Sequence, residues 1–274
     1  MLAVKRWTGL AFVGVTLALG LPAVAEAAGQ SAATKNAAPA AQAAAPAIDP
    51  AALAALDKMG AALRALKQFS LKSDTSIEFV LDTGQKVQLD GDVTYKVKQP
   101  NEFYAEVRSD RRHRQFFYDG KDLTVYSPRL KYYATADGVN ASLREMVLNA
   151  SQNYGIELPL VDLFMWGTEY APKDAIKGAL YVGAGTVGGE RIDQYAFRQE
   201  GVDWQVWISQ ATSLPRKLVI TSLDDPAMPQ YVARLNWDTK ASIPASTFSF
   251  KPPKDAAKIT FVPVDVAVVE EESP

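Results

Sequence analysis

The side chains that most often carry catalysis are scarce in this sequence. One histidine, His113, lies within the run Asp110-Arg-Arg-His-Arg114, and cysteine is absent. A Ser-His-Asp triad needs an imidazole oriented beside a nucleophile, and a zinc site needs several histidine or cysteine ligands. In a hairpin crowded with guanidinium groups, His113 fits a solvated turn residue better than either role.

Carboxylates are plentiful, but nearly all fall at expected turns, where aspartate is favoured for backbone reasons. A glycosidase needs a facing pair of carboxyl groups, and nothing in the sequence selects one. Asp90-Gly91-Asp92 lacks the remaining ligands of a calcium loop, and the glycines from Gly183 to Gly189 open no helix as a phosphate-binding loop does. The sequence therefore predicts no enzyme, no metal and no other cofactor.

A short basic cluster is the remaining charged feature, formed by Arg108, Arg111, Arg112 and Arg114. One interpretation is a charged hairpin that protects a sheet edge against aggregation. The other is a contact with an anion or a partner. The sequence leaves both open.

Most of the chain consists of short segments with the period-2 alternation of strands. In the segment 202–250, Trp204 and Val206 alternate with Gln205 and Trp207, and further alternating runs follow after turns. Similar runs lie between residues 76 and 133 and between 180 and 199, which predicts antiparallel hairpins rather than βαβ units. We expect Trp204, Val206, Leu218 and Ile220 to face the interior, and Trp207 to face away.

Helices are expected where the alternation stops. Asp49-Pro50 forms an N-cap followed by proline at N1 of a helix over 50–67, and apolar spacing predicts a second helix over 140–153. A short apolar segment at 159–166 and a helical turn at 172–177 follow. These elements must cover the dry face of the sheet. The space beneath them is either a packed core or an apolar cavity, with the segment between Gly155 and Gly167 as a movable lid.

The ends of the chain have a different composition. Residues 1–25 have a basic start, an apolar run and an Ala23-Val24-Ala25 ending, which predicts a secretory signal cleaved after Ala25 rather than an uncleaved anchor. We expect an Ala/Pro-rich disordered linker over 26–48, one domain over 49–262 and a disordered acidic tail over 263–274. The net charge is −2, or −4 without Lys5 and Arg6 (27 basic, 31 acidic), which disfavours nucleic-acid binding. No stable membrane insertion of the mature chain is expected.

Several motifs of the chain carry a family resemblance. Tyr118-Asp-Gly-Lys-Asp-Leu-Thr-Val-Tyr-Ser-Pro128 is similar to a strand pair of the LolA/LolB-like superfamily of periplasmic lipoprotein carriers. Trp204-Gln-Val-Trp-Ile208, Leu214-Pro-Arg-Lys217, Trp237 and Thr247-Phe-Ser-Phe-Lys-Pro-Pro253 are similar, in the same order, to their later strands. Within the superfamily, the chain most resembles an uncharacterised family of predicted periplasmic proteins. A lipobox cysteine, which an anchored receptor of this superfamily would need, is missing.

The resemblance implies a mainly β (α+β) fold, in which a strongly curved antiparallel sheet forms a half-open barrel with helices covering its concave face as a lid. It also implies a monomeric, non-enzymatic periplasmic protein whose partner is a lipid or an acylated protein. The alternative is an envelope interaction or regulatory module with a packed core, no ligand and a protein partner. A cavity would be lined by apolar side chains: Phe79, Tyr95, Phe103, Val125, Leu160, Leu163, Phe164, Trp166, Tyr195, Phe197, Trp204 and Val206.

Overall fold

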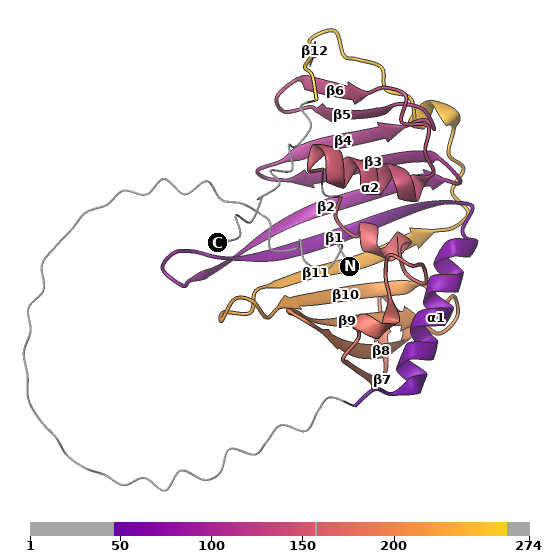
Figure 1. Ribbon diagram of the computed structural model, residues 1–274, viewed down its shortest axis with the longest axis vertical. Coiled ribbons are helices and arrows are strands. Elements are labelled where there is room, and N and C mark those ends of the chain that lie inside the picture. Colours follow the sequence, from indigo (N-terminus) through magenta and orange to yellow (C-terminus); the bar gives the residue numbers. More distant parts are fainter. Residues whose placement is uncertain (1–46, 157, 262–274) are drawn as a thin grey trace, which may run out of the picture. The chain divides into compact units, whose positions relative to one another are not determined.

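The structure, a computed structural model, describes residues 47–156 and 158–261, without the side chains of Asp162 and Phe164. The expected signal peptide, the linker up to residue 46 and the acidic tail lie outside these residues. In the part that is described, one twelve-stranded sheet is accompanied by two α-helices and three short 3-10 helices (Figure 1). No helix in this part is long and apolar enough to cross a membrane.

The sheet is built from two blocks of hairpins that join where β1 pairs with β11. Its strand order is β12-β6-β5-β4-β3-β2-β1-β11-β10-β9-β8-β7, and all pairs are antiparallel except β12–β6. Because β7 and β12 are edges, the curved sheet does not close into a barrel. The strands are β1 (Gln68–Val80), β2 (Lys86–Lys98), β3 (Glu102–Ser109), β4 (His113–Tyr118), β5 (Leu123–Ser127), β6 (Tyr132–Ala136), β7 (Gly178–Val187), β8 (Glu190–Gln199), β9 (Val202–Ser209), β10 (Pro215–Ser222), β11 (Gln230–Asp238) and β12 (Ala257–Lys258).

The alternation predicted for the last hairpins is confirmed. Trp204, Val206 and Leu218 are at most 8% exposed, and half-buried Ile220 packs against the same core. Trp207 lies on the opposite face, where the Lys217 ammonium group is 4.4 Å from its ring centroid. The concave face therefore carries the main hydrophobic core.

Helix α1 (Pro50–Ala65) begins as the sequence predicts. The Asp49 carboxylate accepts a hydrogen bond from the Ala51 amide (2.8 Å), and Pro50 fills the first helical turn. Its buried face is formed by Ala52, Leu56, Met59, Gly60 and Leu63. Just before the helix, Ile48, which we expected in the linker, forms a parallel bridge with Ala179 of β7.

Helix α2 (Leu143–Tyr154) starts three residues later than expected because Ser142 caps it. Ser142 and Glu145 form a reciprocal capping box, and Gly155 ends the helix in the left-handed conformation at φ 61°. The 3-10 helices η1 (Val161–Phe164) and η2 (Lys173–Ala175) follow. Figure 1 shows α1, α2 and this connection on the same face of the sheet. Residues 139–177, here called the lid, cover the concave face together with α1.

The segment after β11 covers part of the convex face. Following η3 (Ala245–Thr247), the Phe250 ring lies 5.0 to 5.3 Å from those of Phe117, Tyr126 and Tyr133. Further along this segment, the short strand β12 pairs with β6 in parallel at the edge of the sheet. This covering segment is distant in sequence from the strands that it contacts. Alternation within the segment therefore could not predict which strand it pairs with.

Candidate functional site

The concave interior brings together most of the residues predicted to line a cavity. Those that are buried in one hydrophobic cluster are Tyr95, Phe103, Leu160, Leu163, Phe197, Trp204 and Val206. Val125, Trp166 and Tyr195 are half-buried and pack against it. Phe79 is half-buried further along β1, opposite Val87, and the side chain of Phe164 lies outside the described residues. That these residues contact a ligand stays a prediction.

Aromatic rings form the part of the interior below α1. Trp204 of β9 stacks on Phe197 of β8 with ring centroids 4.2 Å apart. Trp204 also contacts Trp166 of the lid, with ring centroids 4.9 Å apart. Its indole nitrogen donates a hydrogen bond to Gln199 Oε1 (3.0 Å). Lid and sheet therefore share one aromatic cluster. If the lid moves, Trp166 separates from Trp204.

Two tyrosine hydroxyl groups on the concave face hold the lid to the sheet. Tyr95 of β2 donates to the carbonyl oxygen of Pro159. Tyr118 of β4 donates to the carbonyl oxygen of Ala141 (2.6 Å) and accepts from the Ala141 amide (2.8 Å). Burial raises the pKa of the Tyr118 hydroxyl, so it stays protonated and can donate. Tyr118 was not predicted as a contact of the lid, although its place in an inward-facing apolar series is visible in the sequence.

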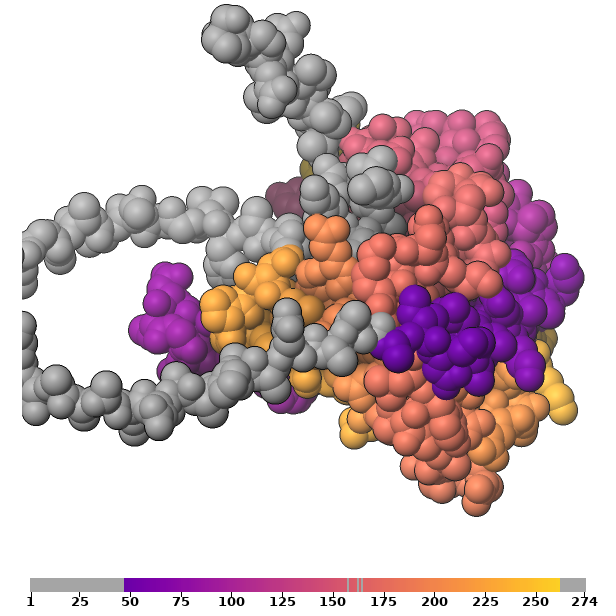
Figure 2. All heavy atoms as spheres, turned by 60° about the horizontal axis from the view of Figure 1, so that its bottom comes forward, coloured from indigo at the N-terminus to yellow at the C-terminus, as the bar shows by residue number. Residues whose placement is uncertain are grey.

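The lid is also attached to α1. Arg64 donates from Nη1 to the carbonyl oxygen of Trp166 (2.8 Å), and Lys173 forms an exposed ion pair with Asp57 (2.9 Å). A Cβ atom at Gly167 would lie 1.9 Å from Arg64 Nη1, so only glycine allows this approach. Figure 2 shows the indigo atoms of α1 directly beside the salmon atoms of the lid segment. The lid is thus held by a few specific polar contacts on two sides.

At one end of the sheet the strands extend past the lid. The turns at 81–85, 110–112 and 223–229 meet at this end, which we call the open end. The β1–β2 hairpin projects furthest, because β3 pairs with β2 only up to Gly91 (Figure 1). Ile77, Phe79, Val87 and Leu89 are only half-buried in this overhang, and Leu81 is 44% exposed. The apolar concave face therefore reaches solvent here.

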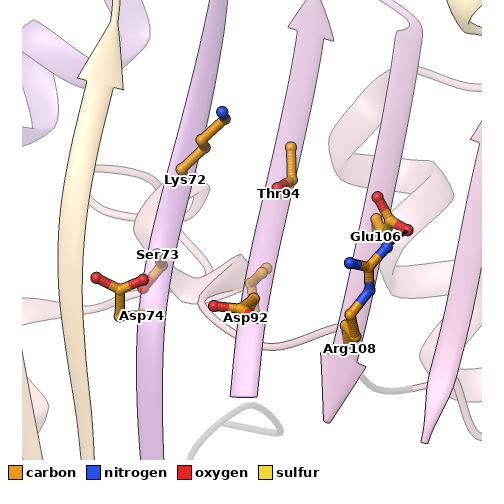
Figure 3. A pocket seen from close by; sticks show the side chains of 8 residues that line it. Lys72, Ser73, Asp74, Asp92, Thr94, Glu106 and Arg108 are labelled. Carbon is orange, nitrogen blue, oxygen red and sulfur yellow. Dashed lines mark hydrogen bonds and ion pairs between the residues drawn. The ribbon is translucent and has the colours of Figure 1, made fainter.

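The convex face carries a separate, polar hollow of about 240 Å³ (Figure 3). Asp74 and Asp92 lie opposite each other in the β1–β2 register, with Lys72 and Arg108 nearby. Among the described residues, no group of three or more histidine, cysteine, aspartate or glutamate side chains could hold a metal ion. The lining residues are Lys72, Ser73, Asp74, Asp92, Val93, Thr94, Glu106 and Arg108.

Glu106, beside this hollow, is the acceptor of a local network. Its carboxylate lies 2.7 Å from His113 Nε2 and 3.0 Å from Arg108 Nη2, and it also accepts from Gln115 (3.2 Å). Burial alone would raise the pKa of Glu106, but the hydrogen bonds from His113 and Gln115 outweigh it and lower the pKa. His113 is therefore a half-buried strand residue with a carboxylate partner, and the expectation of a solvated turn residue is wrong.

The edge-protection interpretation of the basic cluster is also wrong. β3 and β4 lie inside the sheet, each paired on both sides, so their hairpin has no free edge to protect. The turn at 110–112 instead lies at the open end, beside the overhanging β1–β2 hairpin. The arginines need another explanation.

Taken together, these features define an open half-barrel with an apolar concave face and a helical lid. The family model described as predicted periplasmic protein (DUF2092) matches residues 52–262. The chain belongs to this family. Among proteins with curated descriptions, none matches the sequence.

Solved structures of distant proteins are similar to parts of the chain. The Pseudomonas aeruginosa MucA/MucB complex is 13% identical, with a TM-score of 0.41, over 73% of this chain and 61% of that chain. The chain thus spans less than two thirds of that relative. Lipoprotein LppX of Mycobacterium tuberculosis is 14% identical with a TM-score of 0.44, over 72% of this chain and 100% of that chain. A LolA superfamily protein from Nitrosomonas europaea is 10% identical with a TM-score of 0.31, over 73% and 97%.

Proposed function

We propose that the mature chain is a periplasmic protein, released by cleavage after Ala25, that holds an apolar ligand on the concave face of the sheet without catalysing a reaction. The ligand class is a lipid or the acyl chain of an acylated protein. Consistent with export, the chain belongs to a family of predicted periplasmic proteins. The folded unit, a monomer, corresponds to residues 49–262 in this proposal.

One observation carries the proposal: a continuous apolar surface runs from beneath the lid to the open end. Buried Tyr95 and Val93 continue along β2 into half-buried Leu89 and Val87, and on β11 the series continues through Ala233 to Tyr231, opposite Ile77 of β1. An acyl chain could lie along this surface with no charge match, because each buried methylene contributes about 0.8 kcal/mol. In the closed form, Leu160, Leu163 and Met165 of the lid fill the inner part. The ligand replaces these side chains when the lid moves.

Two tryptophans on opposite faces of β9 provide a direct test. One variant keeps Trp204 as its only tryptophan, and the matched variant keeps only Trp207. A brominated fatty acid bound on the concave face should quench Trp204 fluorescence and leave Trp207 unchanged. Native mass spectrometry of the protein purified from the periplasm should show bound lipid. Equal quenching in the two variants, or a lipid-free protein that takes up no fatty acid, would refute the proposal.

A second candidate function is an envelope interaction or regulatory module with no ligand. The observation in its favour is the tight packing beneath the lid, where Tyr95, Leu160 and Leu163 are at most 2% exposed. In that case, crosslinking in the periplasm should trap a specific envelope protein, and the Trp204 variant should show no quenching.

A further inference from the structure

Three guanidinium groups at the open end have no ionic partner among the described residues. Arg108 is paired with Glu106 (3.0 Å), but Arg111, Arg112 and Arg114 form no ion pair within residues 47–156 and 158–261. Arg129, from the next turn, adds a further positive charge by donating to the Asp110 carbonyl oxygen (2.5 Å). Asp110 is the only carboxylate of the turn at 110–112, so the cluster keeps a net positive charge that favours a bound anion.

The register places Arg114 on the apolar concave face, directly after the turn that carries Arg111 and Arg112. Arg114 is two residues before Phe116, which is buried in the concave core, so both side chains lie on that face. Val107, opposite Arg114 on β3, packs against the same core. Burial, and then the charge of Arg112, lower the pKa of the Arg114 guanidinium, in keeping with two neighbouring cations at the rim.

The overhanging β1–β2 hairpin completes this arrangement. Ser109, the last residue before the basic turn, pairs with Gly91, and β2 extends from there through Leu89 and Val87. Figure 1 shows the overhang projecting past the β3–β4 turn on the same side of the molecule. An apolar surface and the basic β3–β4 turn are therefore adjacent at the open end.

We propose that the β3–β4 hairpin binds the phosphate headgroup of an amphiphile whose acyl chain lies on the concave face. This inference rests on the proposed function and names its ligand class as phosphate-bearing lipids. The planar guanidinium fork matches phosphate oxygens, which makes arginine better suited to this role than lysine. Exposed pairs of this kind are weak and screened by salt. The acyl chain therefore provides most of the affinity, and the arginines select among headgroups.

The test compares two lipids that differ only in the phosphate. Vesicles of phosphatidylcholine carry either dioleoyl phosphatidate or dioleoylglycerol in equal minor amounts, and mass spectrometry measures the lipid that the mature protein extracts. The wild-type protein should prefer phosphatidate by about tenfold. The triple variant R111Q/R112Q/R114Q should lose this preference and still extract dioleoylglycerol. A matched variant, K58Q/K67Q/K240Q, removes the same charge at exposed sites that form no ion pair in the described structure, and should keep the preference.

Several results would overturn the inference. These are equal uptake of the two lipids by the wild-type protein, loss of preference in the matched variant, or binding to phosphatidate vesicles without extraction. Inorganic phosphate that binds as tightly as the lipid in calorimetry would show an anion site independent of acyl chains. Unchanged lipid selection with lost crosslinks to an envelope protein in the triple variant would assign the hairpin to a protein partner. If neither lipid is extracted by any variant, the proposed function itself fails.

Discussion

Tyr118→Phe removes one oxygen atom from the contact between sheet and lid. That oxygen donates to the Ala141 carbonyl (2.6 Å) and accepts from the Ala141 amide (2.8 Å), so the change leaves two backbone groups without this partner. The ring, which is fully buried in the concave core, is retained. Leaving a partly buried donor or acceptor unsatisfied costs about 1–3 kcal/mol. We take about 2 kcal/mol for the pair, because water reaches part of this site once the lid opens.

Hydrogen exchange measures where that cost falls. If Tyr118 holds the lid, amides in 141–171 should exchange about thirtyfold faster in Tyr118→Phe, since about 1.4 kcal/mol corresponds to tenfold. The exchange rates of amides in β9 and β10 should change only as far as the substitution changes the global stability of the protein. Tyr132→Phe is the matched control, because Tyr132 is 48% exposed and its hydroxyl forms no hydrogen bond in the described part of the chain. The mutant should also take up an apolar ligand faster, because the closed form is less favoured.

Two outcomes would refute this reasoning. Exchange that rises equally in the lid and in β9 would mean that Tyr118 stabilises the whole domain rather than the lid. If the exchange rates in Tyr118→Phe match those in Tyr132→Phe at every amide, water forms hydrogen bonds with the Ala141 backbone groups as well as Tyr118 does.

Two further predictions concern the lid and the convex face. Gly167→Ala should destabilise the protein by about 1 kcal/mol more than Gly84→Ala in urea unfolding, because both glycines have positive φ (74° and 78°) but only Gly167 faces Arg64. In an Arg64→Ala background this difference should disappear, and its persistence would contradict the contact. Glu106 has a pKa lowered from its ordinary value of 4.5, so its stabilisation is present above that pH and is lost as the pH falls below it. Glu106→Gln should therefore reduce the loss of stability between neutral pH and acid; an unchanged pH profile would show that the Glu106 network contributes nothing.

The local parts of the fold were predictable because they depend on neighbouring residues. Asp49-Pro50 starts α1, Gly155 ends α2, and the alternation around Trp204 gives the buried face of β9. Each of these signals lies within a few residues of the structure that it determines. The strong curvature of the sheet was implied by the family resemblance, whereas the lid was expected from the short apolar segment between Gly155 and Gly167.

The parts that failed depend on pairing between distant segments. The position of the basic hairpin could not be judged until β3 and β4 were known to lie between β2 and β5. Phe250 covers the convex face through Phe117, Tyr126 and Tyr133, and only the outward direction of three aromatic rings on adjacent strands hinted at a covering segment. The contact between Tyr118 and Ala141 joins β4 to the loop before α2, with β5 and β6 between them in the sequence, so no periodic pattern predicts it.

The packed interior and the proposed ligand compete for the same apolar surface. Replacing Leu160, Leu163 and Met165 exposes three buried side chains, which costs about 6 kcal/mol at about 2 kcal/mol each. Breaking the contacts of Tyr95, Tyr118 and Arg64 with the lid adds about 3 kcal/mol at about 1 kcal/mol each. Burying about ten methylenes of an acyl chain returns about 8 kcal/mol. Because these terms nearly balance, small changes in the lid contacts should decide whether the ligand binds, and Tyr118→Phe should increase affinity for an acyl chain as well as the rate of its uptake.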